Sequence, residues 1–379
     1  MWLRKGSRLL AGAGVALCLA AATPAAADPG FGDPAPAAPI GGSLLTGTGV
    51  VLRPLPGAPA LPKGITADAW LVADAGTGQV LAAKAPHAHY LPASTLKTLT
   101  AVTLIPRLDP HQLVKVSWQD AAVDGSKVGL VPGMSYTVDK LFTAMLVVSG
   151  NDAADALADA AGGIHHTVEL MNAEAAHLQA DDTFARTPSG LDGPGESTSA
   201  YDLALIARAG LQLPAFRRYI GTVKSTVPAP HHKHFQIYTH NRLLTSYRGD
   251  IGVKNGYTVA AQGTYIGAAT RDGHTIIVTL LHANPDFWPE AQNLLNWGFA
   301  AEGRVQPVGT LVGPAVPHAS VADVSAPLSR PQTVVLAARH SGGEVRLWQL
   351  ALLAASAAVA VVVSARRQRR RSRLTLPPL

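Results

Sequence analysis

The order of strand-like and helix-like segments narrows the possible folds of this 379-residue chain more than its composition does. Residues 69–74 and 79–84 are apolar runs on either side of a Gly-rich turn, a pattern that predicts a β-hairpin. Residues 265–270 and 274–281 flank Arg271-Asp272-Gly273, and Asp-Gly between apolar runs is a strong hairpin signal. Residues 108–209 are mainly helical in pattern. We therefore expect an α/β (α+β) architecture: one sheet, a helical insertion, and a cleft between two lobes.

The helical region contains recognisable helix ends. Thr137 can cap a helix that is broken at Ser149-Gly150-Asn151, and either Asn151 or Asp152 can cap the next helix. A further helix is predicted over residues 165–178, and Ser199 can cap one that ends at Gly210. Pro289 suits the first turn of a last helix, because its fixed φ fits that position.

The N-terminal residues 1–27 have the pattern of a secretory signal peptide. Three basic residues precede a short apolar run, and Ala25-Ala26-Ala27 offers a small-residue cleavage site. The single cysteine, Cys18, lies within that apolar run. If the signal is removed, the mature chain has no disulfide, no thiol nucleophile and no cysteine metal ligand.

The C-terminal end predicts a membrane anchor. Residues 347–364 form an apolar run interrupted only by Gln349, within a predicted transmembrane helix at 346–365. The run is just long enough to span a bilayer, with Trp348 near its outer edge. The basic tail 366–379 carries six arginines, and such a cluster stays on the cytoplasmic side. A buried core helix fits poorly beside this tail. We expect a single-pass cell-membrane protein whose main domain is extracytoplasmic.

The net charge of +6 comes from the two ends of the chain. Three positive charges lie in the signal and six in the tail, so the rest carries 6 − 9 = −3. The basic balance therefore reports on topology and gives no support for nucleic-acid binding. Between the ends, residues 28–66 are a predicted Pro/Ala/Gly-rich linker or extended arm, 67–302 a folded domain, and 303–345 a stalk.

A candidate nucleophile lies in the stretch Tyr90–Thr100, which contains Ser94 and Lys97. A spacing of three places both side chains on one face of a helix. A serine hydroxyl needs a neighbouring base to become a good nucleophile, and a lysine can be that base if burial or a second cation lowers its pKa. This S-x-x-K motif recurs by chance, so further motifs are needed to interpret it.

Two downstream stretches have matching chemistry. Ser149-Gly150-Asn151, at a predicted helix-to-helix turn, supplies a hydroxyl for proton relay and an amide that can bind a peptide carbonyl. Lys254-Asn255-Gly256, on a predicted strand, supplies a cation and a glycine that lets a ligand approach the backbone. Nothing in these motifs resembles a set of metal ligands, so we expect no metal and no other cofactor.

The three motifs, in this order on helix, turn and strand, resemble those of penicillin-binding proteins. Flanking matches are Ser149-Gly150-Asn151-Asp152-Ala153, Thr183-Phe184, Gly190-Leu191-Asp192, Asn241-Arg242-Leu243-Leu244 and Gly256-Tyr257-Thr258. Over about residues 67–301 the chain resembles low-molecular-mass D-alanyl-D-alanine carboxypeptidases of the S11 peptidase family. The resemblance implies the DD-peptidase/β-lactamase-like serine transferase fold, with an antiparallel sheet flanked by helices and a mainly helical lobe.

The resemblance also implies catalytic roles. Ser94 would attack the carbonyl between the two terminal D-alanines of a peptidoglycan stem peptide, and Lys97 would take its proton. Ser149, held by hydrogen bonds to Lys97 and Lys254, would relay a proton to the leaving D-alanine. Asn151 would orient the substrate amide and Lys97, and Lys254 would attract the substrate carboxylate. Water would hydrolyse the acyl-enzyme, and β-lactam antibiotics would trap it.

The remaining substrate-binding positions follow Lys254. The backbone N–H groups of Ser94 and Tyr257 would form an oxyanion hole, and Gly256 would allow close approach. Asn255 stands where this family usually has Thr or Ser, whose hydroxyl binds the substrate carboxylate. An amide NH₂ can also donate a hydrogen bond, with a different reach, so substrate affinity is affected more than reaction type.

Two other functions remain open. A class A β-lactamase uses the same triplets but needs a loop glutamate for deacylation. Glu169 with Asn172 lies within a predicted helix, and Glu196 lacks the expected neighbours, so neither fits that role. The other alternative is a catalytically impaired penicillin-binding or cell-wall scaffold protein, for which Asn255 is the sequence support. Carboxypeptidase and endopeptidase activity are not distinguished, and residues 231–234 (His-His-Lys-His) are interpreted as a solvated loop.

Overall fold

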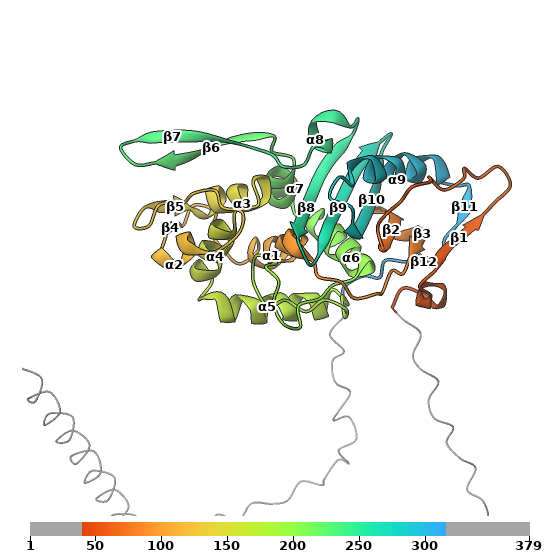
Figure 1. Cartoon of the computed structure of the whole chain (residues 1–379), viewed down its shortest axis with the longest axis horizontal. Coiled ribbons are helices and arrows are strands. Elements are labelled where there is room, and N and C mark those ends of the chain that lie inside the picture. The colour runs from red at the N-terminus through yellow and green to blue at the C-terminus, as the bar shows by residue number, and fades with distance from the viewer. Residues whose placement is uncertain (1–39, 316–379) are drawn as a thin grey trace, which may run out of the picture. The chain divides into compact units, whose positions relative to one another are not determined.

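An antiparallel sheet lies at the centre of the described part of the chain, residues 40–315 of this computed structural model (Figure 1). The strand order is β11-β1-β3-β2-β10-β9-β8, with β12 also paired to β3. The bounds are β1 (Val50–Pro54), β2 (Ala69–Asp74), β3 (Gln79–Lys84), β8 (Asp250–Thr258), β9 (Gln262–Arg271), β10 (His274–Ala283), β11 (Val305–Gln306) and β12 (Gly309–Thr310). Both predicted hairpins, β2–β3 and β9–β10, are confirmed.

Both faces of the sheet are buried, because helices cover each of them. Leu71 of β2 belongs to the core on one face, packed by α6 (Ala200–Gly210). Trp70 and Val72 belong to a second core on the other face, packed by α9 (Trp288–Ala301). Successive side chains of a strand point to opposite faces, so a strand between two helical layers is apolar at every position.

The remaining helices include those of a mainly helical lobe, as expected. They are α1 (Lys97–Leu104), α2 (Trp118–Ala122), α3 (Val138–Val147), α4 (Asn151–Ala160), α5 (Ile164–His177), α7 (Pro214–Ile220) and α8 (Leu243–Ser246), with the 3₁₀ helices η1 (Ser43–Thr46) and η2 (Ala93–Leu96). Two further two-stranded antiparallel sheets are β4 (Leu113–Lys115) with β5 (Ser135–Thr137), and the hairpin β6 (Lys224–Ala229) with β7 (Lys233–Tyr238). In Figure 1 the β6–β7 ribbon extends above α3, and residues 231–234 at its tip are exposed.

Two of the predicted helix caps are confirmed, and one is wrong. The Thr137 and Ser199 hydroxyls accept hydrogen bonds from the backbone N–H groups of Lys140 and Asp202. The N-cap of α4 is Gly150, and no side chain caps that helix. Asn151 and Asp152 are engaged in longer-range hydrogen bonds, which compete with local capping.

The predicted limits of the folded domain, 67 and 302, are too narrow. β1 lies within the predicted linker yet pairs with β3 and β11, and Leu45 of η1 is fully buried. β11 and β12 lie within the predicted stalk. Composition misleads here because a short strand can end at a proline such as Pro54 and needs only a few apolar residues.

The structure does not describe residues 1–39 and 316–379. The predicted signal peptide, transmembrane helix and basic tail therefore lie outside the described residues. Among the helices of residues 40–315, none combines the length and the apolar character needed to cross a membrane.

Candidate active site

Ser94 and Lys97 lie where η2 passes into α1. Ser94 is half-buried in η2, and Lys97 is the first residue of α1 and fully buried. The Lys97 Nζ atom lies 2.9 Å from the Ser94 Oγ atom, close enough for direct proton transfer. The predicted nucleophile–base pair is thus brought together, as a spacing of three on a helical segment requires.

The Lys97 amine has two further contacts, and both are to oxygens that can only accept. Its Nζ atom donates to Asn151 Oδ1 at 2.6 Å and to the Ser189 carbonyl at 2.6 Å. A neutral amine has two N–H donors and one lone pair. Two donors directed at these two oxygens leave the lone pair for the Ser94 hydroxyl, which is the arrangement of a general base.

The electrostatics around Lys97 favour this neutral form. Burial lowers the pKa of the Lys97 amine well below its usual range, and the Lys254 ammonium nearby lowers it further. Asp155, Glu196 and Asp152 oppose this shift with their negative charges. Burial also lowers the pKa of Lys254, to about 7. Both effects are those expected for amines removed from water beside like charge.

Asn151 is fixed by its own neighbours. Its Nδ2 atom donates to the Asp124 carbonyl at 2.7 Å, which turns its Oδ1 atom toward Lys97. Its backbone N–H donates to the Ser126 carbonyl at 2.7 Å. The structure thus supports the predicted contact with Lys97, while the amide NH₂ is already engaged with the protein.

Ser149 lies at the turn between α3 and α4, in the left-handed backbone conformation with φ 62°. Such a conformation costs energy for a residue with a Cβ atom, and it recurs at functional sites. Within residues 40–315, the Ser149 hydroxyl makes no hydrogen bond to Lys97 or Lys254, in contrast to the prediction. The Lys254 Nζ atom instead donates to the Asn255 carbonyl at 2.6 Å.

The edge strand β8 packs directly against the nucleophile. A Cβ atom added to Gly256 would lie 2.7 Å from the Ser94 backbone nitrogen, so only glycine allows this approach. Asn255 is half-buried, and Tyr257 is 53% exposed. Gly256 thus brings the free edge of β8 beside Ser94, where an extended peptide could add to the sheet.

A loop that the sequence analysis did not assign to the site completes it. Ser189 supplies a carbonyl to Lys97, and Pro188 accepts a hydrogen bond from the Thr100 hydroxyl at 2.7 Å. The Thr258 hydroxyl donates to Asp192 Oδ1 at 2.8 Å and ties the loop to β8. The sequence signal for this loop is Gly190-Leu191-Asp192, one of the stretches that match the carboxypeptidase family.

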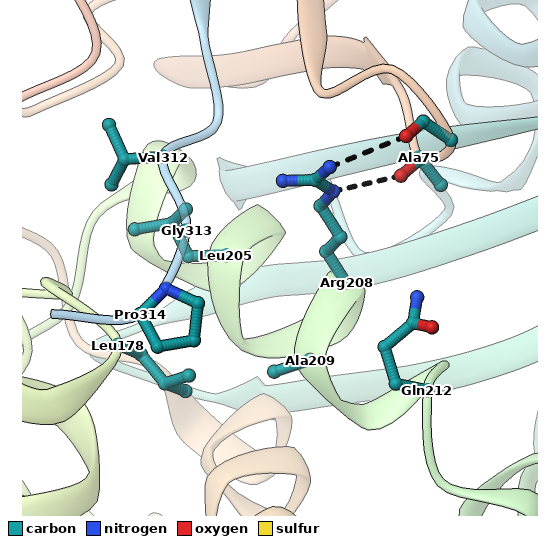
Figure 2. A pocket seen from close by; sticks show the side chains of 10 residues that line it. Ala75, Leu178, Leu205, Arg208, Ala209, Gln212, Val312, Gly313 and Pro314 are labelled. Atoms are coloured by element: carbon teal, nitrogen blue, oxygen red, sulfur yellow. Dashed lines mark hydrogen bonds between the residues drawn. The ribbon is translucent and has the colours of Figure 1, made fainter. Parts of the chain in front are cut away.

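Two cavities of similar size lie in different places. One of about 550 Å³ is enclosed by α6, the 75–76 turn and the segment 312–314, where Arg208 donates to the Ala75 carbonyl (Figure 2). It contains none of the predicted site residues. The other, of about 510 Å³, borders the Ser149 turn and is lined by residues 126–128, Val148 and 235–240. The second cavity, rather than the first, adjoins the site.

Two clusters of His and carboxylate groups in the described part of the chain are close enough to hold an ion. They are Asp74 with His274 and Glu302, and His87 with Asp182 and Asp202. Neither cluster contains a predicted catalytic residue, and neither includes a histidine from the β6–β7 tip.

Three features define a serine enzyme that acts through an acyl intermediate. They are the buried Lys97 beside Ser94, the Asn151 amide at the start of α4, and Lys254 on the edge strand β8. Comparison with known proteins identifies the family of the chain. The S11 peptidase family, described as D-alanyl-D-alanine carboxypeptidase, matches residues 57–285. The chain belongs to this family, as the motifs predicted.

Individual relatives support this family assignment. The chain is 40% identical to D-alanyl-D-alanine carboxypeptidase DacB2 of Mycobacterium tuberculosis over 262 residues, 67% of this chain and 89% of that protein. It is 30% identical to DacF of Bacillus subtilis over 232 residues, 59% of this chain and 60% of that protein. A crystal structure of a D-alanyl-D-alanine carboxypeptidase from M. tuberculosis gives a TM-score of 0.65 at 38% identity, covering 69% of this chain and 100% of that one.

A structure described as a DD-transpeptidase is also similar to the chain. The Streptomyces K15 DD-transpeptidase structure gives a TM-score of 0.61 at 28% identity, covering 64% of this chain and 100% of that one. These likenesses confirm the predicted DD-peptidase fold.

Proposed function

We propose that Ser94 of this serine-type D-Ala-D-Ala carboxypeptidase attacks the carbonyl between the two terminal D-alanines of a peptidoglycan stem pentapeptide. Lys97 is the general base. The observation that carries the proposal is the 2.9 Å separation of Lys97 Nζ and Ser94 Oγ in a buried setting, where two acceptor oxygens leave the amine lone pair for the hydroxyl. Attack transfers the Ser94 proton to Lys97 and forms a tetrahedral intermediate.

The next step expels D-alanine and leaves an acyl group on Ser94. The leaving nitrogen needs a proton, which Lys97 returns directly or through the nearby Ser149 hydroxyl. The backbone N–H groups of Ser94 and Tyr257 stabilise the oxyanion. Lys254 and Asn255 bind the substrate carboxylate, by charge and by an amide donor respectively. Water then hydrolyses the acyl-enzyme.

The same chemistry accounts for β-lactam binding. A β-lactam carbonyl acylates Ser94 in the same way, but its leaving nitrogen stays attached and the acyl-enzyme persists. The β-lactamase alternative gains nothing from Glu169, whose side chain is 61% exposed on α5. The impaired-scaffold alternative rests on Asn255 alone.

The test is mass spectrometry of a synthetic stem pentapeptide incubated with the folded domain. We expect loss of one terminal alanine, and no loss with Ser94→Ala. Labelling with a fluorescent penicillin is run in parallel. Labelling without peptide cleavage would favour the impaired protein, and rapid penicillin turnover without peptide cleavage would favour a β-lactamase.

The chain is also proposed to work at the outer face of the cell membrane. The support is the apolar run 347–364 and the six arginines after it. Residues 28–379 are expected to partition with membranes, and residues 28–340 to stay in the soluble fraction. Recovery of the longer chain in the soluble fraction would contradict the anchor.

A further inference from the structure

Glu196 is a buried carboxylate on the loop that precedes α6, and only 5% of it is exposed. Its Oε1 atom lies 3.3 Å from the backbone nitrogens of Arg186 and Thr187, and 3.3 Å from the Thr187 hydroxyl oxygen. Its Oε2 atom has no hydrogen-bond partner in the described part of the chain. Burying a carboxylate costs free energy, so its position needs a reason beyond loop solubility.

The hydrogen bonds of Glu196 lead to the catalytic lysine. Thr187, held by Glu196, accepts a hydrogen bond from the Gly190 backbone N–H at 2.9 Å. This bond closes a tight turn over residues 187–190, in which the Ser189 carbonyl accepts a hydrogen bond from Lys97 Nζ at 2.6 Å. Glu196 therefore supports, through Thr187 and Gly190, an acceptor that helps to orient the base.

Glu196 also acts on Lys97 through charge. Its carboxylate raises the pKa of Lys97, against the lowering caused by burial and by Lys254. Burial raises the pKa of Glu196 itself to about 7, so its charge is strongest above neutral pH. The charged groups around this pair are Asp192 and Arg186 on the same loop, Asp152 and Asp155 on α4, and Lys254 on β8.

We propose that Glu196 is a positioning residue for acylation: it holds the turn that presents the Ser189 carbonyl to Lys97, and its charge offsets that of Lys254 beside the same amine. The proposal rests on the role of Lys97 as base in the proposed function. It gives Glu196 a role distinct from that of a deacylating glutamate, because the residue acts on the base and not on a water.

Two substitutions separate the two effects. Glu196→Gln keeps a carbonyl-type acceptor for Thr187 but removes the charge, whereas Glu196→Ala removes both. Penicillin acylation is measured by stopped flow from pH 5 to 9, with thermal unfolding of each variant. Glu169→Gln, an exposed glutamate on α5, is the matched control and should follow the wild type.

For Glu196→Gln the acid limb of the acylation profile should move to lower pH. Removal of a negative charge near Lys97 favours the neutral amine, so on the part of the limb above about pH 7, where Glu196 is ionised, acylation should be about threefold faster, equal to a shift of about half a pH unit. Below that pH the Glu196 carboxyl is already protonated, and the two rates should converge. For Glu196→Ala the acylation rate should fall at least about tenfold at every pH, because the Ser189 carbonyl is no longer held.

An unmoved acid limb in Glu196→Gln would overturn the electrostatic part. Equal rate losses in the Gln and Ala variants, in step with their thermal stability, would reduce Glu196 to a packing residue. If Glu196→Ala does not fold, the pH profile of Glu196→Gln decides alone. Lys97→Met is included so that failures are distinguishable: wild-type acylation in that variant would refute the proposed base, whatever Glu196 does.

Discussion

Lys97 has no carboxylate within hydrogen-bond distance in the described structure, although its side chain is fully buried. A buried ammonium without a close counter-ion is strongly disfavoured, whereas a neutral amine is tolerated. The surroundings thus keep a lysine in its basic form. The sequence predicts this environment from Ser94, Lys97 and a second lysine, Lys254. The spacing of three residues brings Ser94 and Lys97 together in any helical segment.

A pH dependence of acylation follows at the residue scale. Because the neutral amine is the base, the acylation rate should fall as pH drops through the lowered pKa of Lys97. Lys97→Met should slow acylation by about 10²–10⁴-fold and remove this acid limb. A fluorescent penicillin followed by stopped flow measures both.

The control for this prediction is Lys115→Met, an exposed lysine on β4, which should retain the wild-type profile. A Lys97→Met enzyme that acylates at the wild-type rate would show that the base lies elsewhere.

Asn255 gives a second prediction at the residue scale. Its half-buried amide sits on the edge strand two positions before the exposed Tyr257. Asn255→Thr should preserve or raise turnover of D-Ala-D-Ala substrates, because a hydroxyl donates to a carboxylate at shorter reach. Asn255→Ala should weaken substrate binding by about 0.5–3 kcal/mol, a range that covers neutral hydrogen bonds and those to a charged group. Steady-state kinetics on the stem pentapeptide test this, and identical kinetics for all three proteins would show that position 255 does not touch the substrate.

Side-chain chemistry is what the sequence makes predictable at this site. Ser189 and Asp124 contribute backbone carbonyls, and every residue has one, so their residue types carry no signal. The sequence neighbours of Glu196 do not fit a β-lactamase, so the sequence alone gives this residue no role. Only the fold shows that its loop turns back onto Lys97.

At the scale of elements, helix positions followed well from periodicity and caps. The helix predicted over residues 165–178 is Ile164–His177, and the break at 149–151 falls between α3 and α4. Periodicity succeeds there because each helix buries one face against the core. It fails to say what Asp152 does, since a carboxylate at a helix start can cap its own helix or reach another segment.

Asp152 reaches another segment. Its carboxylate accepts hydrogen bonds from the backbone N–H groups of Val128, Gly129 and Leu130, at 2.9, 2.8 and 3.0 Å, and so ties the 126–130 loop to α4. Asp152→Ala should destabilise the domain by about 3 kcal/mol or more, because buried donors lose a charged acceptor. Urea unfolding measures this, and the exposed Asp181→Ala is the control. A loss below about 1 kcal/mol would mean that water replaces the carboxylate at little cost.

At the scale of the whole described domain, the arrangement of strands around a helical region was predictable, but the pairing of its first and last segments was not. The first and last segments of residues 40–315 pair with each other: Leu55 donates to the Arg304 carbonyl, and Thr310 to the Gly41 carbonyl. Such pairing joins residues about 250 positions apart. Short strands with so few apolar residues give no local pattern from which a long-range contact can be inferred.

A comparison of two chains tests whether these end segments belong to the folded unit. Residues 40–315 include η1, β1, β11 and β12, whereas residues 67–302 include only the domain predicted from sequence. The shorter chain loses the partner of β3 and the cover of a core that contains Leu45. It also loses Thr66, whose backbone N–H and hydroxyl donate to the buried Glu290 carboxylate.

The shorter chain should therefore melt at least about 5 °C below the longer one, since about 2 kcal/mol of lost packing and hydrogen bonding shifts the midpoint by that much in a domain of this size. Ser94 and Lys97 are present in both chains, so penicillin labelling at low temperature should persist in whatever fraction remains folded. Thermal unfolding by circular dichroism is the measurement, and a third chain, residues 40–302, separates the contribution of β11 and β12 from that of β1. Equal unfolding midpoints for all three chains would mean that the end strands add no stability to the sheet. The limits predicted from composition would then describe the cooperative folding unit.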